Sequence, residues 1–490
     1  MDVLQLLWNA VPPELAVGFV AANVLVGLIA VGVVPHNRPP GAAWGWILLI
    51  VLFPVLGVLA YWAIGRADLP AHRKAKQREA AHLVDRDDPA APDETGSIPD
   101  WVTETVQLNA HHGGFPLRDG NALEILTDYD ATLAAMAEAV RAAESFVHCQ
   151  FYITVADPTT EPVIAALEDA HARGVTVRVL IDHLGSVTYP GYKQLVARLE
   201  ADGIPWRRML PVRPWRGEYQ RPDLRNHRKI LVVDGTVAFT GSQNLIDASY
   251  NKKSNRKKGM QWHDVMLRVQ GPVVADLNAV FATDWYCEAD ELIHKDTPAP
   301  RPSPVPSGCT VQVLPTGPGQ EQPASLQLFV HLFAYADERI TICTPYFVPD
   351  ESMLNVLRTA VNRGVEVRLY LGSTPRSSVT YHAQSSYHEM LVASGMQVYL
   401  YPPPHVLHSK FLLIDDQVAL VGSANMDNRS FALDHEISLM VLDQNFVTQM
   451  HAVVADYHAD SQELDLDTWL SRPWYRKYVD NAARLTSALQ

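Results

Sequence analysis

The sequence has 490 residues, a hydrophobic fraction of 48% and a formal net charge of −14 at pH 7. A single core stops growing at roughly 250 to 300 residues, so we expect several units. The net charge alone says little about partners, because sites depend on local clusters of charge. Four cysteines stand far apart without a CxxC pair: Cys149, Cys287, Cys309 and Cys343. This spacing argues against a structural zinc site or a disulfide framework and favours isolated buried thiols in a reducing compartment.

Two long uncharged runs lie near the N-terminus, Leu15 to Val34 and Ala42 to Ile64. Each is close to the roughly 20 residues that cross a hydrocarbon core of about 30 Å. The alternative is a cleaved signal peptide, but that requires a basic start, whereas this N-terminus carries Asp2 and Glu14. The sequence therefore predicts a transmembrane hairpin over residues 1–66, with helices at about 15–34 and 42–64.

Basic residues follow the second run, whereas the turn between the runs carries only Arg38. They are Arg66, Arg73, Lys74, Lys76 and Arg78. The excess of positive charge indicates that the remainder of the chain lies in the cytoplasm. Residues 67–100 are rich in Ala, Asp, Glu and Pro, and we expect a cytoplasmic tether there, part of it a charged helix.

A proline-rich stretch at 298–308 favours extended chain and separates a first half, 101–297, from a second half, 309–490. The halves repeat each other: Ala172–Asp182 matches Asn362–Gly372, each a helix end followed by a buried strand. Strand and helix candidates precede both, at Ser145–Ile153 and Pro162–Ala172 in the first half and at Arg339–Val348 and Asp350–Val361 in the second. The predicted fold class is α/β, with two pseudo-symmetric sandwich halves that share one active site.

One motif, H-x-K-x4-D-x6-G-S-x-N, occurs once in each half. Histidine and lysine two residues apart share one face of an extended strand. Two copies at corresponding places in a repeat are far less expected by chance than one. The residues concerned are His227, Lys229, Asp234, Ser242 and Asn244 in the first copy, and His408, Lys410, Asp415, Ser423 and Asn425 in the second.

If the halves meet with pseudo-two-fold symmetry, these side chains converge into a site suited to phosphodiester cleavage. One imidazole attacks phosphorus and forms a phosphohistidine, while the other protonates the leaving alkoxide. The lysines neutralise the non-bridging oxygens, and Ser and Asn offer hydrogen bonds to phosphate. We expect no metal and no other cofactor. A lone histidine at a strand end is more often structural, so the hypothesis depends on the pairing.

Four carboxylates accompany the motifs. Asp234 and Asp415 are counted among the catalytic residues, although they end apolar strands and could equally form a turn or an ion pair. Asp264 and Glu436 are predicted to orient the two imidazoles, because a catalytic base is commonly held by a third group.

The two motifs resemble those of the phospholipase D superfamily, and the chain as a whole is similar to its bacterial cardiolipin synthases. The likeness extends from the N-terminal hairpin to the C-terminus, with Thr344–Asp350 and Gly422–Phe431 as its most specific stretches. It implies two phospholipase D-like halves in a multi-pass protein of the bacterial inner, or plasma, membrane. It also implies transfer of a phosphatidyl group from one phosphatidylglycerol to another through a phosphohistidine, with release of glycerol.

Carried over residue by residue, the resemblance makes His227 and His408 the nucleophile and the acid/base. The N-terminal histidine is often the nucleophile in the superfamily, which favours His227. Lys229, Lys410, Asn244 and Asn425 would bind phosphate. One departure is His263, where the family pattern leads us to expect a longer basic residue before the acidic one.

Local charge and aromatic side chains suggest further contacts with the bilayer. Arg207, Arg208, Arg213, Arg216, Arg221, Arg225 and Arg228 precede or enter the first motif, and Lys252, Lys253, Arg256, Lys257 and Lys258 form a second basic run. We interpret both as basic loops that face anionic headgroups, the alternative being solvated loops. Trp206, Trp215 and Tyr219 either enter the interface or pack in the core. We predict a C-terminal docking helix whose aromatic residues pack: Trp469, Trp474, Tyr475 and Tyr478.

Other functions are compatible with the same motifs. A hydrolytic phospholipase D would use water to resolve the intermediate, and a related transphosphatidylase would use another acceptor alcohol. A nuclease would require a basic groove, and a non-catalytic scaffold would be expected to have lost one motif. We therefore expect anionic phospholipids and the bilayer as partners and no nucleic acid. The oligomeric state, the acyl-chain preference and the regulation stay open.

Overall fold

The computed structural model describes residues 13–36, 38, 40–65, 69–83, 100–293, 304–305, 307–318, 324–373 and 378–487. Most of the predicted linker at 298–308 and residues 84–99 of the predicted tether lie outside the described residues. The chain forms two compact units. One extends to residue 68 and includes Arg221–Asp223, and the other, the main unit, comprises 69–220 and 224–490.

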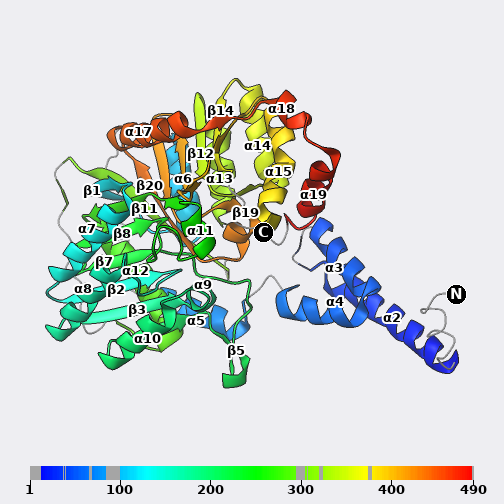
Figure 1. Cartoon of the computed structure of the whole chain (residues 1–490), viewed down its shortest axis with the longest axis horizontal. Helices are drawn as coiled ribbons and strands as arrows, with labels where there is room; N and C mark the ends of the chain where they lie inside the picture. The colour runs from blue at the N-terminus through cyan, green and yellow to red at the C-terminus, as the bar shows by residue number, and fades with distance from the viewer. Residues whose placement is uncertain are drawn as a thin grey trace. The chain divides into compact units, whose positions relative to one another are not determined.

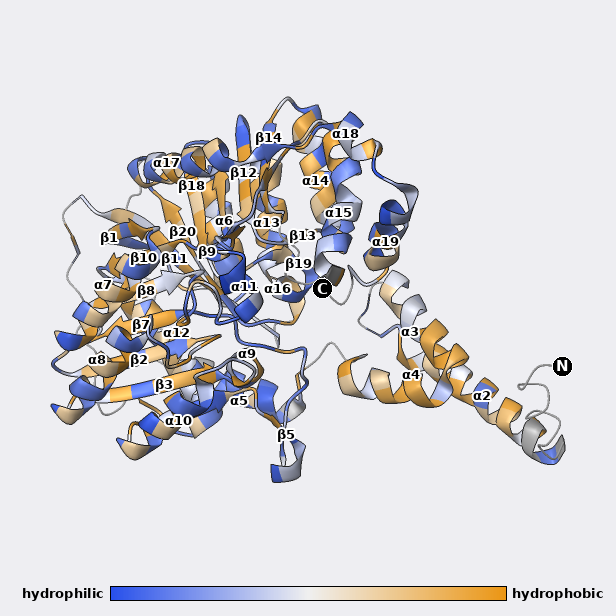
Figure 2. Ribbon diagram, in the orientation of Figure 1, coloured by the Kyte–Doolittle hydropathy of each residue, from blue (hydrophilic) through white to orange (hydrophobic). Residues whose placement is uncertain are grey.

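The N-terminal unit is helical and strongly hydrophobic (Figure 2). Its elements are α2 (Pro13–Val33), α3 (Pro40–Leu52), α4 (Pro54–Ala60) and a π-helical turn, Tyr61–Gly65. A small core contains Ala30, Val34, Ala43, Ile47 and Ile50. Many of its other large apolar side chains are exposed, so this unit does not cover its own hydrophobic surface.

The second predicted helix, 42–64, is not continuous. α3 ends at Leu52, and α4 begins at Pro54, which occupies its first turn. Proline has no backbone N–H and its ring clashes with the turn before it, so the helix breaks at Phe53. None of the described helices combines the length and the apolar character that crossing a membrane would need.

One sheet runs through both halves of the main unit and has 15 strands within the described residues (Figure 1). From one edge to the other they are β21 (Gln462–Glu463), β15 (Gln397–Tyr401), β14 (Glu366–Gly372), β12 (Arg339–Thr344), β17 (Phe411–Ile414), β18 (Val418–Gly422), β20 (Glu436–Leu442), β11 (Cys309–Thr316), β1 (Arg118–Leu126), β10 (Met266–Gln270), β8 (Val237–Gly241), β7 (Ile230–Val233), β2 (Phe146–Phe151), β3 (Thr176–Asp182) and β4 (Trp206–Met209). The halves therefore join at the antiparallel pair β11 and β1.

The strand order is the same on both sides of this junction. Moving outward, β20, β18, β17, β12, β14 and β15 correspond to β10, β8, β7, β2, β3 and β4. In each half the last three strands of this series pair in parallel. The repeat predicted from the sequence is confirmed, including the paired strands β3 and β14.

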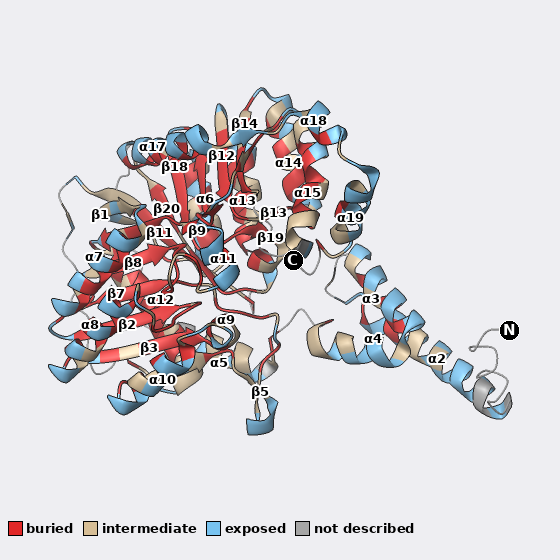
Figure 3. Ribbon diagram, viewed as in Figure 1, coloured by how far each residue is buried: buried red, intermediate tan, exposed pale blue. Residues whose placement is uncertain are grey.

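Helices lie against the sheet in layers that bury the strands (Figure 3). The principal ones are α7 (Tyr129–Arg141), α8 (Glu161–Ala172) and α12 (Val273–Ala289) in the first half, and α13 (Ala324–Tyr335), α14 (Glu351–Asn362) and α17 (Gln444–Asp460) in the second. One core, formed with α12 and α17, contains residues from both halves, while α7 with α8 and α13 with α14 contribute to two further cores. The predicted α/β sandwich is confirmed. The four cysteines are free thiols, of which Cys149 and Cys343 are buried.

Part of the segment predicted to be a tether packs on the first half. Helix α5 (Ala71–Leu83) contacts α12, and Arg73 donates two hydrogen bonds to Glu288 at 2.7 and 2.8 Å. Lys76 Nζ also lies 2.5 Å from Asp290 Oδ1. This charged helix is thus docked by ion pairs, and α6 (Asp100–His111) follows where the tether was predicted to end.

The motif aspartates, Asp234 and Asp415, lie at the opposite ends of β7 and β17 from the histidines, and both adopt positive φ angles, 53° and 50°. Each carboxylate accepts three backbone N–H bonds from the loop that enters a central strand. The donors are Glu144, Ser145 and Phe146 for Asp234, and Asp337, Glu338 and Arg339 for Asp415. Their inclusion among the catalytic residues is therefore corrected, because these contacts support the fold.

Asp415→Ala is expected to lower the free energy of unfolding by about 2 to 4 kcal/mol, because three backbone N–H groups lose their acceptor. Thermal unfolding of the full-length protein in detergent measures the effect. The neighbouring Asp416→Ala is the matched control: Asp416 is exposed, its ion pair with Arg339 lies at the surface, and its loss should cost about 1 kcal/mol at most. Equal destabilisation by the two substitutions would contradict the role of Asp415.

Candidate active site

The two motifs enter the site on extended segments that each half holds for the other. His227 N donates to His435 O at 2.8 Å, and His408 N donates to His263 O at 2.9 Å. Just before His408, β16 (His405–Leu407) pairs in parallel with β9 (Gln261–His263) of the first half. His263 thus contributes its carbonyl to this contact, so the unexpected side chain at this position leaves the contact intact.

Side chains alternate along the first motif, as extended backbone requires. His227 and Lys229 both lie against the Tyr152 ring, with ring centroids 4.2 Å apart for His227 and Nζ 5.6 Å from the centroid for Lys229. Arg228 points to α12 instead, where it binds Asp284 at 2.7 Å. The histidine and the lysine therefore share one side of the chain.

Each histidine is held by a carboxylate from the opposite half. Glu436 Oε1 lies 3.1 Å from His227 Nδ1, and Asp264 Oδ1 lies 2.6 Å from His408 Nδ1. When Nδ1–H donates to a carboxylate, Nε2 is left with the lone pair that can attack a substrate or accept a proton. The crossed pairs make one site out of two halves.

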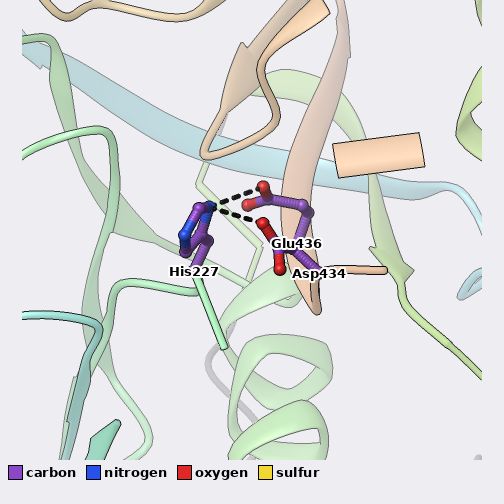
Figure 4. Close-up of side chains that lie close together, drawn as sticks. All are labelled: His227, Asp434 and Glu436. Atoms are coloured by element: carbon purple, nitrogen blue, oxygen red, sulfur yellow. Dashed lines mark hydrogen bonds and ion pairs between the residues drawn. The ribbon is translucent and has the colours of Figure 1, made fainter. Parts of the chain in front are cut away.

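A second carboxylate, Asp434, also lies beside His227 (Figure 4). Its Oδ2 is 3.4 Å from Nδ1, and its Oδ1 accepts the backbone N–H of Arg225 at 3.2 Å. Our sequence analysis missed Asp434, although its position two residues before Glu436 was a signal. His227, Asp434 and Glu436 each offer an atom within 4.8 Å of the others, a spacing that a cation could also use.

Two serines predicted to bind phosphate hold the carboxylates instead. Ser242 Oγ donates to Asp264 at 2.6 Å, and Ser423 Oγ donates to Glu436 at 2.6 Å. Each hydroxyl also accepts a backbone N–H at 3.0 Å, from Val265 or Ile437. A hydroxyl has one proton to donate, so these contacts use the donor that a phosphate would need.

The preceding glycines allow this close approach. A Cβ on Gly241 would lie 2.4 Å from Val265 O, and one on Gly422 would lie 2.2 Å from Ile437 O. No side chain can be accommodated so near a backbone oxygen. The Gly-Ser pair in each motif therefore brings β8 or β18 close enough for serine to reach the orienting carboxylate.

The two motif asparagines differ in their contacts. Asn244 Nδ2 donates to Tyr250 OH at 2.9 Å, and its Oδ1 accepts from Ile153 N at 3.2 Å. The side-chain oxygen of Asn425 is buried and has no hydrogen-bond partner in the described part of the chain. The fold engages Asn244 at both ends of its amide. A phosphate oxygen accepts hydrogen bonds, as an amide oxygen does, so Nδ2 is the atom of Asn425 that can donate to phosphate.

Burial separates the protonation behaviour of the two pairs. It lowers the pKa of His227 to about 3 and raises the pKa of Glu436 to about 7, although Lys229 and Lys410 both act to lower the latter. Burial also acts to raise the pKa of Asp264, but His408 and Lys410 outweigh it and bring that pKa to about 2. His227 is therefore neutral at neutral pH, while ionised Asp264 stabilises positive charge on the His408 ring.

The arginines near the first motif do not form one basic loop. Arg225 and Arg228 are 3% and 6% exposed, and they bind Asp182 and Asp284 inside the first half. The prediction that they face the bilayer is wrong, because each is neutralised by a buried carboxylate. Arg207 and Arg216 are exposed, as are the side chains of the second basic run around α11 (Lys253–Lys257).

Known proteins are similar to this chain over most of its length. A family model described as cardiolipin synthase, PLD-like domain, matches residues 136–285 and 329–457, and a phospholipase D-nuclease N-terminal model matches 24–66. The chain is 30% identical to cardiolipin synthase A of Proteus mirabilis, over 95% of this chain and 96% of that one. It is 33% identical to cardiolipin synthase A of Pseudomonas fluorescens, over 93% and 95%.

A solved structure gives an independent comparison of the fold. Phosphatidylserine synthase of Haemophilus influenzae superposes with a TM-score of 0.62 at 15% identity, over 79% of this chain and all of that one. Each half carries one motif, and the family model matches more than half of the chain. Both findings identify the same family. The chain belongs to the PLD-like cardiolipin synthase family.

Proposed function

We propose that this protein makes cardiolipin and glycerol from two molecules of phosphatidylglycerol. The observation that carries the proposal is the pair of crossed contacts, His227 with Glu436 and His408 with Asp264, which brings two carboxylate-held histidines into one site. The relatives described above, named cardiolipin synthase A, support the choice of reaction.

In the first step, Nε2 of neutral His227 attacks the phosphorus of one phosphatidylglycerol. A bond forms between nitrogen and phosphorus, and the bond from phosphorus to the oxygen of the headgroup glycerol breaks. Protonated His408 donates its proton to that oxygen, so glycerol leaves as a neutral alcohol. Lys229 and Lys410, buried at 2% and 4% exposure, stabilise the charge on the non-bridging oxygens.

In the second step, a hydroxyl of another phosphatidylglycerol attacks the phosphohistidine. His408, now neutral, takes the hydroxyl proton, and the bond between nitrogen and phosphorus breaks. The product is cardiolipin, and both histidines return to their starting states. His227 retains 17% side-chain exposure and His408 retains 8%, which supports His227 as the group that first reaches the lipid.

The assay is purified enzyme in liposomes of phosphatidylglycerol alone, with products read by mass spectrometry. Cardiolipin and glycerol are expected from the wild type, and His227→Ala and His408→Ala should lower the rate by roughly a thousandfold or more. His451→Ala, a histidine that pairs with Asp416 at the surface, is the control and should retain activity. Phosphatidic acid without cardiolipin would instead identify a hydrolase.

The same assay, quenched within one turnover, tests the nucleophile. A phosphatidyl adduct is expected on His227 in the wild type, because the reaction is stopped before a second lipid resolves it. An adduct on His408 would reverse the two roles and leave the reaction itself intact.

Activity should fall as the pH drops below about 7, because Glu436 then takes up a proton and no longer supports Nδ1–H of His227. Glu436→Gln keeps a hydrogen-bond acceptor but removes the titration. Its kcat/KM should therefore be lower and lose the acidic limb that the wild type shows near pH 7. The profile is measured with phosphatidylglycerol in mixed micelles. An unchanged acidic limb in the variant would assign that limb to another group.

The family is membrane-associated, and we propose that residues 1–66 form the anchor as a hairpin that places the main unit in the cytoplasm. Helices α2 to α4 are strongly apolar and carry one charge, Glu14 in the first turn of α2. These helices and the basic residues that follow them support this topology.

To test this topology, a cysteine at His36→Cys should react from outside intact spheroplasts with a membrane-impermeant maleimide. Lys257→Cys should react only after permeabilisation. Labelling of both from outside would place the main unit on the other side.

A further inference from the structure

The C-terminal helix α19 (Trp474–Arg484) packs on the second half through its polar side. Asp480 is 2% exposed and binds His382 of α15 (Ser378–Ala393) at 2.7 Å and Arg472 at 3.0 Å. The guanidinium of Arg484 lies 4.5 Å from the centroid of the Tyr387 ring, also on α15. Ion pairs and a cation–π contact therefore fix the orientation of this helix.

The opposite side of α19 is apolar and faces outward. Trp474 is 77% exposed, Tyr475 53%, Tyr478 69% and Leu485 87%. At 100° per residue, these four lie within about one third of the helix circumference, on the side away from Asp480. The prediction that these aromatic residues pack is wrong for α19, although Trp469 of α18 (Leu466–Leu470) is buried.

This orientation is the reverse of that in an ordinary surface helix, which buries its apolar side. The exposed rings alone present on the order of 400 Å² of largely apolar surface, as much as the largest patch on a typical monomer. Tyrosine and tryptophan have apolar bodies with polar tips, the combination that favours the interface between water and hydrocarbon. Charged side chains of α19 lie outside this apolar arc.

The charges around the patch match an anionic surface. Residues 466–487 contain four basic side chains and two acidic ones, in a chain whose net charge is −14. Lys477 sits on the same helix beside the apolar arc, where its side chain can reach headgroups while the rings lie in the interface. Basic side chains near an anionic membrane each contribute on the order of 1 kcal/mol.

We propose that the outward face of α19, formed by Trp474, Tyr475, Tyr478 and Leu485, lies in the interface of a bilayer that contains anionic phospholipid. It is a membrane contact additional to the N-terminal helices. It holds the main unit against the surface that contains its substrate. The inference rests on the proposed action on membrane phospholipid, but the contact is measured without turnover.

Tyr478→Cys, labelled with an environment-sensitive fluorophore, tests the contact in the full-length protein. Cys287→Ser and Cys309→Ser form the background, since Cys149 and Cys343 are buried. In vesicles of equal phosphatidylglycerol and phosphatidylcholine, emission should shift to the blue and be quenched by spin-labelled lipid. Arg476→Cys, exposed on the opposite side of the same helix, is the matched control and should show little of either effect.

Two results would overturn the proposal. Quenching equal to that of the Arg476→Cys control would show that the face does not meet lipid. A blue shift without lipid quenching would mean that protein covers the face. In that case, a disulfide between two Tyr478→Cys chains would identify the cover as a second copy, and its absence would point to another segment of the same chain.

The functional consequence is tested with Trp474→Ser combined with Tyr478→Ser. The apparent KM for phosphatidylglycerol in vesicles should rise roughly tenfold, because bilayer contact is lost. The kcat should stay unchanged in mixed micelles, since neither residue belongs to the active site. Equal loss of kcat in both assays, with a lowered Tm, would show a structural role instead and overturn the proposal.

Discussion

His227 and His408 are each held by a carboxylate and a backbone carbonyl of the opposite half. This crossing requires the two halves to be in register at the β11–β1 junction, because a shift would separate both pairs at once. The motif serines and glycines support the same crossed contacts. Ser242 and Ser423 hold the carboxylates, and Gly241 and Gly422 let the serines approach.

The two copies of the motif have diverged in charge while keeping their geometry. His227 faces two buried acids, Glu436 and Asp434, and burial keeps the His227 ring neutral while raising the pKa of both carboxyls. In the other pair, ionised Asp264 stands beside His408 without a second acid at the corresponding position, which Trp262 occupies. A nucleophile needs a free lone pair and an acid needs a proton, so this difference suits a division of labour.

Much of the fold was predictable because it is written as a repeat. Corresponding helix ends and buried strands recur in both halves, and the motif spacing predicted which histidines and lysines would share a face. The contacts of Ser242 and Asp234 were not predictable, because their partners lie on neighbouring strands or loops rather than nearby in the sequence.

The failures among charged and aromatic residues have a similar cause. Arg228 is neutralised by Asp284, which is 56 residues away, so a run of arginines gave a misleading impression of a basic surface. The composition of α19 indicates an amphipathic helix but not which side meets the protein. The burial of Asp480 shows that the polar side of α19 meets the protein.

The crossed carboxylates also bear on how such a chain could have originated. A symmetric pair of identical single-motif subunits would have to use one sequence for both the attacking and the proton-transferring histidine. Joining the copies in one polypeptide removes that restriction, since Glu436 and Asp264 can then mutate independently. An asymmetry encoded in the sequence is open to a fused chain and closed to a homodimer.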